Sequence, residues 1–124
     1  MVRRVSDPVV WTNLFFVLPI MVSSSVGYYW LSFTLCMSFV TSVSYHLSRE
    51  TLYSGLDYVF AFSNVFGCLW IVFSQVLSPS ICCGCALALS SLQYFRCERG
   101  GRLYDLHHSL WHVQISLAVT FLCM

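Results

Sequence analysis

Two histidines, His108 and His112, lie four residues apart at the start of an uninterrupted apolar segment. On a helix, residues i and i+4 share one face and lie roughly 5–6 Å apart, so both imidazoles would point to the same place. Ionisable groups inside a membrane are costly and usually face the interior of a helix bundle, where they find a partner. Two neutral imidazoles that converge in this way predict half of a metal site.

Three further polar residues are expected at a similar depth. His46 ends one apolar segment, Asp57 opens the next, and Ser42 lies one helical turn before His46 on the same face. Three imidazoles leave a zinc ion with an open fourth position, which is typical of catalytic sites. We therefore predict that His46, His108 and His112 bind zinc. Asp57 would act as general base or orient a water, and Ser42 would hydrogen-bond to that water or to an oxyanion.

Each of these residues also has a simpler interpretation. His108 and His112 are compatible with a pair of interfacial histidines near lipid headgroups, and a lone His46 would complement the dipole at a helix C-terminus. Asp57 alone is compatible with an N-terminal cap. Ser42 could bond back to its own helix, as serine commonly does in membranes.

The composition indicates that the surroundings of these residues are lipid. Hydrophobic residues make up 58% of the 124 residues and charged residues 9%, with no lysine, and the mean hydropathy is +0.75. A soluble domain has roughly a quarter charged residues. The chain is therefore predicted to be an integral, multi-pass membrane protein. It has no basic surface for phosphates, so nucleic acid is excluded as a partner.

Breaks in the apolar segments predict the helices. A membrane span needs about 20 apolar residues, and two segments here have twice that length. Turn-forming residues at 23–27 and 78–80 divide them. The result is an all-α transmembrane bundle, a single domain over residues 1–124, with about five spans at 8–23, 27–47, 55–77, 79–95 and 106–124.

The charges support this number of spans. With five spans, the N-terminus and the loops near residues 50 and 100 lie on one side of the membrane. All six arginines fall on that side, namely Arg3, Arg4, Arg49, Arg96, Arg99 and Arg102. The positive-inside rule then predicts that this side, and with it the proposed metal site, faces the cytosol.

The polar residues also resemble a known signature. The matching segments are Ser42–His46 (SVSYH), Asp57 eleven residues later, and His108–His112 (HSLWH). In this order they are similar to the motifs of the CREST superfamily, which joins alkaline ceramidases, progestin and adipoQ receptors, and myomaker-type transmembrane proteins. The resemblance implies a zinc ion held by the three histidines, and contacts from Asp57 and Ser42 to a water.

The chain departs from that superfamily in its number of helices. CREST proteins have seven, with the HxxxH motif in the last, whereas only five spans fit here. The interval from Asp57 to His108 is too short for two more. Loss of a helix pair keeps the sidedness of the last helix, so the site could still assemble. A truncated or spliced product would explain the shorter chain, and so would a homo-oligomer in which a second copy completes the bundle.

The function that these observations favour is zinc-dependent hydrolysis of a lipid amide or ester. Two alternatives remain open at the level of the sequence. One is a non-enzymatic, myomaker-like membrane protein whose metal site is structural. The other is a receptor-like binding module.

The predicted orientation can be tested through Cys97, which lies among the arginines of the last loop. In a variant whose only cysteine is Cys97, a membrane-impermeant thiol reagent should label the protein only when admitted to the cytosol. Labelling of Cys97 from outside intact cells would contradict five spans with a cytosolic N-terminus and a C-terminus on the opposite side.

Overall fold

The computed structural model describes residues 8–95 and 103–124, and over these residues the chain is helical, with no strand. Its elements are α1 (Pro8–Thr12), the 3-10 helix η1 (Asn13–Phe16), α2 (Val17–Ser25), α3 (Tyr29–Ser48), α4 (Thr51–Ser74), α5 (Pro79–Phe95) and α6 (Tyr104–Cys123). Because α1, η1 and α2 follow one another without a break, we refer to them together as the N-terminal helix. The described residues thus form five helices, as the sequence predicted.

The helices end where the sequence offers turn chemistry. Gly27 has a φ of +87°, a conformation that glycine adopts without strain, and it lets the chain turn from α2 into α3. At the other long apolar segment, Pro79 is the first residue of α5, where its missing N–H costs nothing. The hydroxyl of Ser78 caps this helix by accepting a hydrogen bond from the Ile81 N–H at 3.2 Å.

The connection between α3 and α4 is shorter than predicted. α4 begins at Thr51 and not near residue 55, so Arg49 and Glu50 alone separate the two helices. Arg49 makes this possible because it adopts the left-handed conformation, with φ 63°, and its N–H bonds the Tyr45 carbonyl at 2.8 Å. Asp57 therefore lies inside α4, in its second turn, which rules out the interpretation of Asp57 as an N-terminal cap.

The N-terminal helix is tightened one turn before its proline. Pro19 has no N–H to donate to the Phe15 carbonyl, and its ring crowds that carbonyl. The turn that contains Phe15, Asn13–Phe16, is wound as a 3-10 helix, a tighter form that is used in short pieces. The effect of Pro19 on this helix is thus a local change of winding. Asp7, which directly precedes Pro8 and would suit the cap of this helix, lies outside the described residues.

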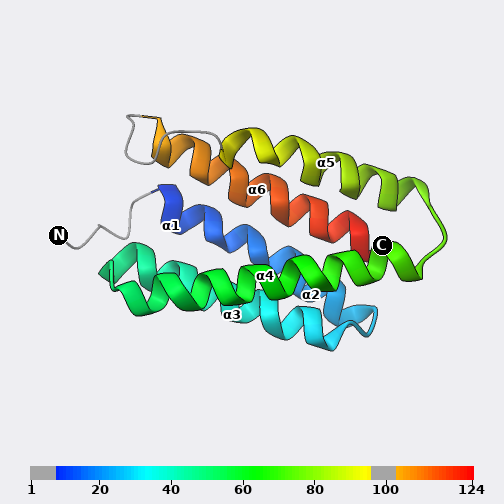
Figure 1. Ribbon diagram of the computed structural model, residues 1–124, viewed down its shortest axis with the longest axis horizontal. Helices are drawn as coiled ribbons and strands as arrows, with labels where there is room; N and C mark the ends of the chain where they lie inside the picture. The colour runs from blue at the N-terminus through cyan, green and yellow to red at the C-terminus, as the bar shows by residue number, and fades with distance from the viewer. Residues whose placement is uncertain (1–7, 96–102) are drawn as a thin grey trace.

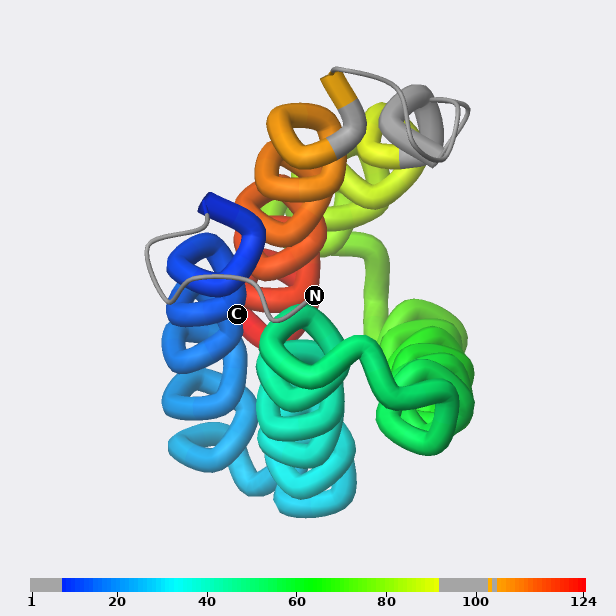
Figure 2. Tube along the Cα trace, turned by 90° about the vertical axis from the view of Figure 1, so that its left-hand side faces the viewer, coloured from blue at the N-terminus to red at the C-terminus, as the bar shows by residue number. Residues whose placement is uncertain are grey.

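The five helices lie roughly side by side, with the connections at their two ends (Figure 1). α3 packs along α4, α5 packs along α6, and α6 also packs against the N-terminal helix. In the view of Figure 2, α6 lies between the N-terminal helix and α5, whereas α4 contacts mainly α3. The core is formed by buried side chains of the N-terminal helix, α3, α4 and α6, namely Phe16, Leu31, Leu35, Ile71, Val119 and Cys123.

The ends of the helices lie on the two sides of the bundle that were predicted from five spans. The start of the N-terminal helix, the α3–α4 connection and the start of α6 lie at one end of the bundle (Figure 1). The α2–α3 and α4–α5 connections lie at the opposite end, as does the last residue of the chain. The sequence motifs Ser42–His46 and His108–His112 thereby come to the same end of the bundle.

Two of the described helices are long and apolar enough to cross a membrane: the N-terminal helix, Pro8–Ser25, and α4, Thr51–Ser74. α3 and α6 are each 20 residues long but carry many polar side chains. Those that are buried in α3 are Thr34, Ser38, Thr41, Ser42 and His46, and those in α6 are Ser109, His112, Ser116 and Thr120. The hydropathy of α3 and α6 is therefore lowered by side chains that face the bundle interior.

Polar side chains also join neighbouring helices. Asn64 of α4 donates a hydrogen bond from its amide to the Ser38 hydroxyl of α3 at 2.8 Å. Gln75 donates to the Tyr28 hydroxyl at 2.6 Å, which ties the end of α4 to the start of α3. Such interhelical hydrogen bonds are a common adhesive between apolar helices.

A glycine allows α5 and α6 to approach each other closely. A Cβ atom placed on the buried Gly84 would lie 2.7 Å from Leu122 Cγ and 2.9 Å from the Ala118 carbonyl oxygen. The second atom belongs to the main chain of α6 and cannot move without shifting the helix. Small residues at such crossings let helix backbones approach closely.

We predict that Gly84→Ala destabilises the protein by about 1–3 kcal/mol, the usual cost of overpacking. Gly55→Ala is the matched control, because nothing lies within 4 Å of its added Cβ. Removal of a glycine from a helix interior stabilises the helix by up to about 1 kcal/mol. Thermal unfolding followed by circular dichroism in detergent should therefore move in opposite directions for the two variants. A melting temperature of Gly84→Ala at or above that of wild type would contradict the packing.

Candidate metal centre

The three histidines are supplied by the facing ends of α3 and α6. His46 lies in the last turn of α3, and its side chain is 2% exposed. His108 and His112 lie in the first half of α6, one helical turn apart. His112 is also 2% exposed, whereas His108 is half-buried. Protein thus encloses the imidazoles of His46 and His112, whereas the imidazole of His108 is partly accessible.

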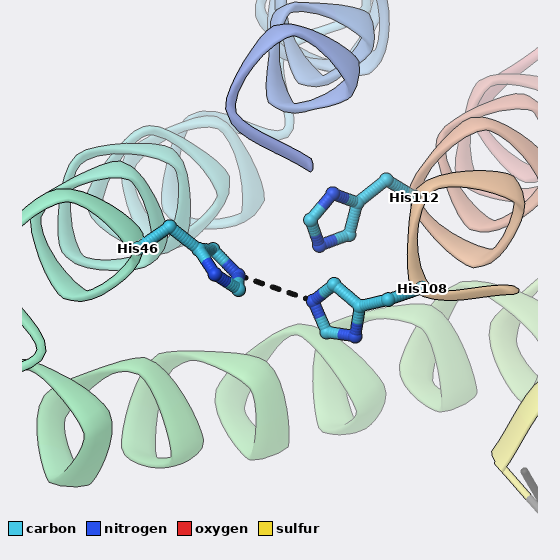
Figure 3. A group of neighbouring side chains, drawn as sticks. All are labelled: His46, His108 and His112. Atoms are coloured by element: carbon cyan, nitrogen blue, oxygen red, sulfur yellow. Dashed lines mark hydrogen bonds between the residues drawn. The ribbon is translucent and has the colours of Figure 1, made fainter. Parts of the chain in front are cut away.

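The imidazoles converge as the sequence predicted. One nitrogen from each of His46, His108 and His112 lies within 4.8 Å of the other two. His46 Nε2 and His108 Nε2 are 3.2 Å apart, and Figure 3 shows the three rings meeting between α3 and α6. The ring planes are inclined to one another by 66–71°, so the rings meet edge to face and do not stack. These three histidines could hold a metal ion.

The spacing of the nitrogens can be compared with that of a zinc site. Tetrahedral ligands at a Zn–N distance of about 2.05 Å lie about 3.3 Å from one another. The pair formed by His46 and His108, at 3.2 Å, already has this separation. His112 would complete the set by a small inward movement, because its nitrogen is no more than 4.8 Å from the others. Three imidazole donors without a thiolate also suit zinc.

Apolar and aromatic groups surround the cluster. Phe16 of the N-terminal helix meets the His112 ring in a T-shaped contact, with 5.8 Å between the ring centroids. Tyr45 lies 5.4 Å from His46. Trp111 lies 6.1 Å from His108 and 5.6 Å from His112. Such apolar surroundings strengthen electrostatic interactions at the site.

The two residues predicted to act beside the metal lie outside the cluster of nitrogens. Ser42 is buried in α3, 4% exposed, one turn before His46. Asp57 is half-buried in α4 and accepts a hydrogen bond from the Thr41 hydroxyl at 3.5 Å. Its carboxylate is not part of the group within 4.8 Å of the histidine nitrogens. His107 is rotated about 100° around the helix from its neighbour His108, and it is likewise outside that group.

One neighbour of the site was not predicted. The hydroxyl oxygen of Thr12, in the N-terminal helix, lies 3.3 Å from His112 Nδ1. Thr12 belongs to no sequence motif, and it is 100 residues from His112. Its only signal in the sequence is its depth, since it lies near the start of the first apolar segment, at the same end of the bundle as the histidines.

Comparison with known proteins adds no identification. No protein-family model, curated protein sequence or solved structure matches this chain.

Substitution of two adjacent histidines, His107 and His108, can test whether the cluster binds zinc. His108→Ala would remove one of the three candidate ligands. Zinc affinity should then fall by at least the roughly 10–100-fold that is typical of losing a residue that only orients a ligand. His107→Ala, the matched control, removes the neighbouring imidazole from outside the cluster and should bind zinc like wild type. The measurement is competition with a chromophoric chelator in detergent. Equal losses in the two variants would exclude the assignment of His108 as a ligand.

Proposed function

We propose that the chain is a multi-pass membrane protein of the CREST type that hydrolyses a lipid amide or ester with a zinc ion. The observation that carries the proposal is that one nitrogen from each of His46, His108 and His112 lies within 4.8 Å of the others, although His46 and His108 are 62 residues apart in sequence. Burial of polar groups in an apolar bundle is costly unless they are paired or bind a ligand. The order of the motifs, S-x-x-x-H, Asp and H-x-x-x-H, is the second support.

The multi-pass arrangement is supported by where the polar side chains of the bundle lie. The hydroxyl and imidazole groups that lower the hydropathy of α3 and α6 are buried inside. α4, in contrast, turns large apolar side chains outward: Leu52, Val59, Phe62, Val65, Phe66, Trp70 and Phe73 are all more than half exposed. An apolar exterior around a polar interior is the arrangement expected of helices that lie in lipid.

Within this proposal, the residues divide the work. When bound, zinc supplies a Lewis acid that acidifies a water and polarises the carbonyl of the lipid. Asp57, whose carboxylate lies 3.5 Å from the Thr41 hydroxyl, is the group that would take up a proton from the attacking water. Ser42, on the same face of α3 as His46, donates a hydrogen bond to the developing oxyanion. The half-buried side of His108 is the side from which the lipid enters.

A structural metal site is the second candidate, and the position of Asp57 favours it. A carboxylate outside the cluster leaves three histidines that join the end of α3 to the start of α6. In this case the metal would fasten the two halves of the chain, as in a non-enzymatic, myomaker-like protein. A structural site raises stability when it is loaded, whereas a catalytic site makes turnover depend on Asp57.

Asp57→Asn separates these two functions. In the hydrolase, it should retain zinc and lower turnover by about 10²–10⁴-fold, because it removes a general base. Ser42→Ala should cost less, as the loss of one hydrogen bond among several. The measurement is the release of fatty acid from ceramide and phospholipid in mixed micelles, normalised to bound zinc.

Glu50→Gln is the control, since it neutralises an exposed carboxylate just before α4. It should leave turnover unchanged. If wild type releases no fatty acid while removal of zinc lowers its melting temperature, the structural site is correct and the hydrolase is not. Turnover by Asp57→Asn equal to that of wild type would also contradict the role of Asp57 as base.

A further inference from the structure

We propose that Thr12 is a positioning residue of the metal centre, which holds the His112 ring in the tautomer whose free Nε2 lone pair faces His46 and His108. The inference rests on the proposed zinc site and extends it to the N-terminal helix. The first observation is the distance of 3.3 Å between Thr12 Oγ1 and His112 Nδ1. Figure 3 shows the two ring nitrogens of His112 on opposite sides, one toward the N-terminal helix and one toward the other histidines.

The hydrogen bonds of Thr12 determine which atom donates. Its hydroxyl donates to the Val9 carbonyl at 3.2 Å, and Val9 is fully buried. The one hydroxyl proton is then used, and the oxygen has lone pairs left. Thr12 Oγ1 therefore accepts a hydrogen bond from His112 Nδ1–H. The Val9 carbonyl also hydrogen-bonds the His112 ring, and a carbonyl can only accept. A neutral imidazole carries one N–H, so Nε2 is left as an acceptor, the form in which histidine binds a metal.

A second contact on the same face of the helix fixes the plane of the ring. Phe16 follows Thr12 by one helical turn and meets the edge of the His112 ring, with 5.8 Å between centroids and 69° between planes. Thr12 thus favours this tautomer together with the Val9 carbonyl, and Phe16 packs against the edge of the ring. Partners of this kind orient metal-binding histidines in known sites, and their loss typically lowers metal affinity about 10–100-fold.

The conservative variants Thr12→Val and Thr12→Ser test the inference. Valine has nearly the shape of threonine but no acceptor, so zinc should bind about 10–100-fold more weakly. Serine keeps the hydroxyl and should restore affinity to within a few-fold of wild type. Affinity is measured by chelator competition on the full chain in detergent. The readout is independent of any activity.

Thr120→Val is the matched control on α6. Thr120 is also buried, and among the residues that the structure describes its hydroxyl bonds its own helix, at the Ser116 carbonyl, at 2.8 Å. It should bind zinc like wild type. Thr12→Val with the affinity of wild type, or with a loss no larger than that of Thr120→Val, overturns the inference. A loss that Thr12→Ser does not restore overturns it as well.

Nitrogen NMR of histidine-labelled, metal-free protein tests the tautomer without any loss of fold. The signals of His112 should show a protonated Nδ1 and an unprotonated Nε2. In Thr12→Val the preference for this tautomer should fall. The opposite tautomer in wild type overturns the role of Thr12. If wild type binds no zinc, the proposed metal function fails, whereas the NMR result still decides the role of Thr12.

Discussion

The structure depends on the cost of placing imidazole groups inside an apolar bundle. Hydrophobic residues make up 58% of the chain, which has no lysine, so polar side chains must satisfy one another within the fold. His46 and His112 are each 2% exposed, and transfer of such groups from water without a partner costs several kcal/mol. In the fold, the end of α3 lies beside the start of α6, so that the imidazole of His46 faces those of His108 and His112. The same end of the bundle must therefore collect α3, α6 and the N-terminal helix.

Helix register is the means by which this end is assembled. A shift of one residue rotates a side chain by about 100° around its helix, which would turn His46 away from α6. The left-handed conformation of Arg49 ends α3 at Ser48, two residues after His46, and returns the chain directly into α4. The 3-10 turn of the N-terminal helix also changes the directions in which side chains leave the helix, because it has about 3.0 residues per turn and not 3.6. It lies between Thr12 and Pro19 and includes Phe16, which contacts His112.

The positions of the breaks between helices were easier to predict from the sequence than the contacts that each helix makes. Gly27 and Pro79 have backbone requirements that are visible in the residues themselves, and the four-residue spacing of His108 and His112 is a property of any helix. The start of α4 was placed too late because the polar interval before it contains no glycine, and an arginine in the left-handed conformation has no clear signal. Thr12 could not be found, since its contact with His112 depends on the rotation and depth of a helix 100 residues away. By length and hydropathy alone, two of the described helices could cross a membrane, because the mean hydropathy of a helix averages its buried and its exposed side chains.

The division between ligands and carboxylate bears on what the site can do. Three neutral imidazoles would leave the full charge of a divalent cation uncompensated, and in apolar surroundings that charge acts strongly on nearby groups. A carboxylate inside the cluster would bind the ion as a fourth ligand and partly neutralise its charge, as in structural sites with four protein donors. Asp57 lies instead outside the group of histidine nitrogens, with its carboxylate 3.5 Å from the Thr41 hydroxyl of the neighbouring helix. In a hydrolase, Asp57 would act as a base from outside the ligand set, and substrate would approach beside the half-buried His108. In a structural site, Asp57 would have no role at the ion.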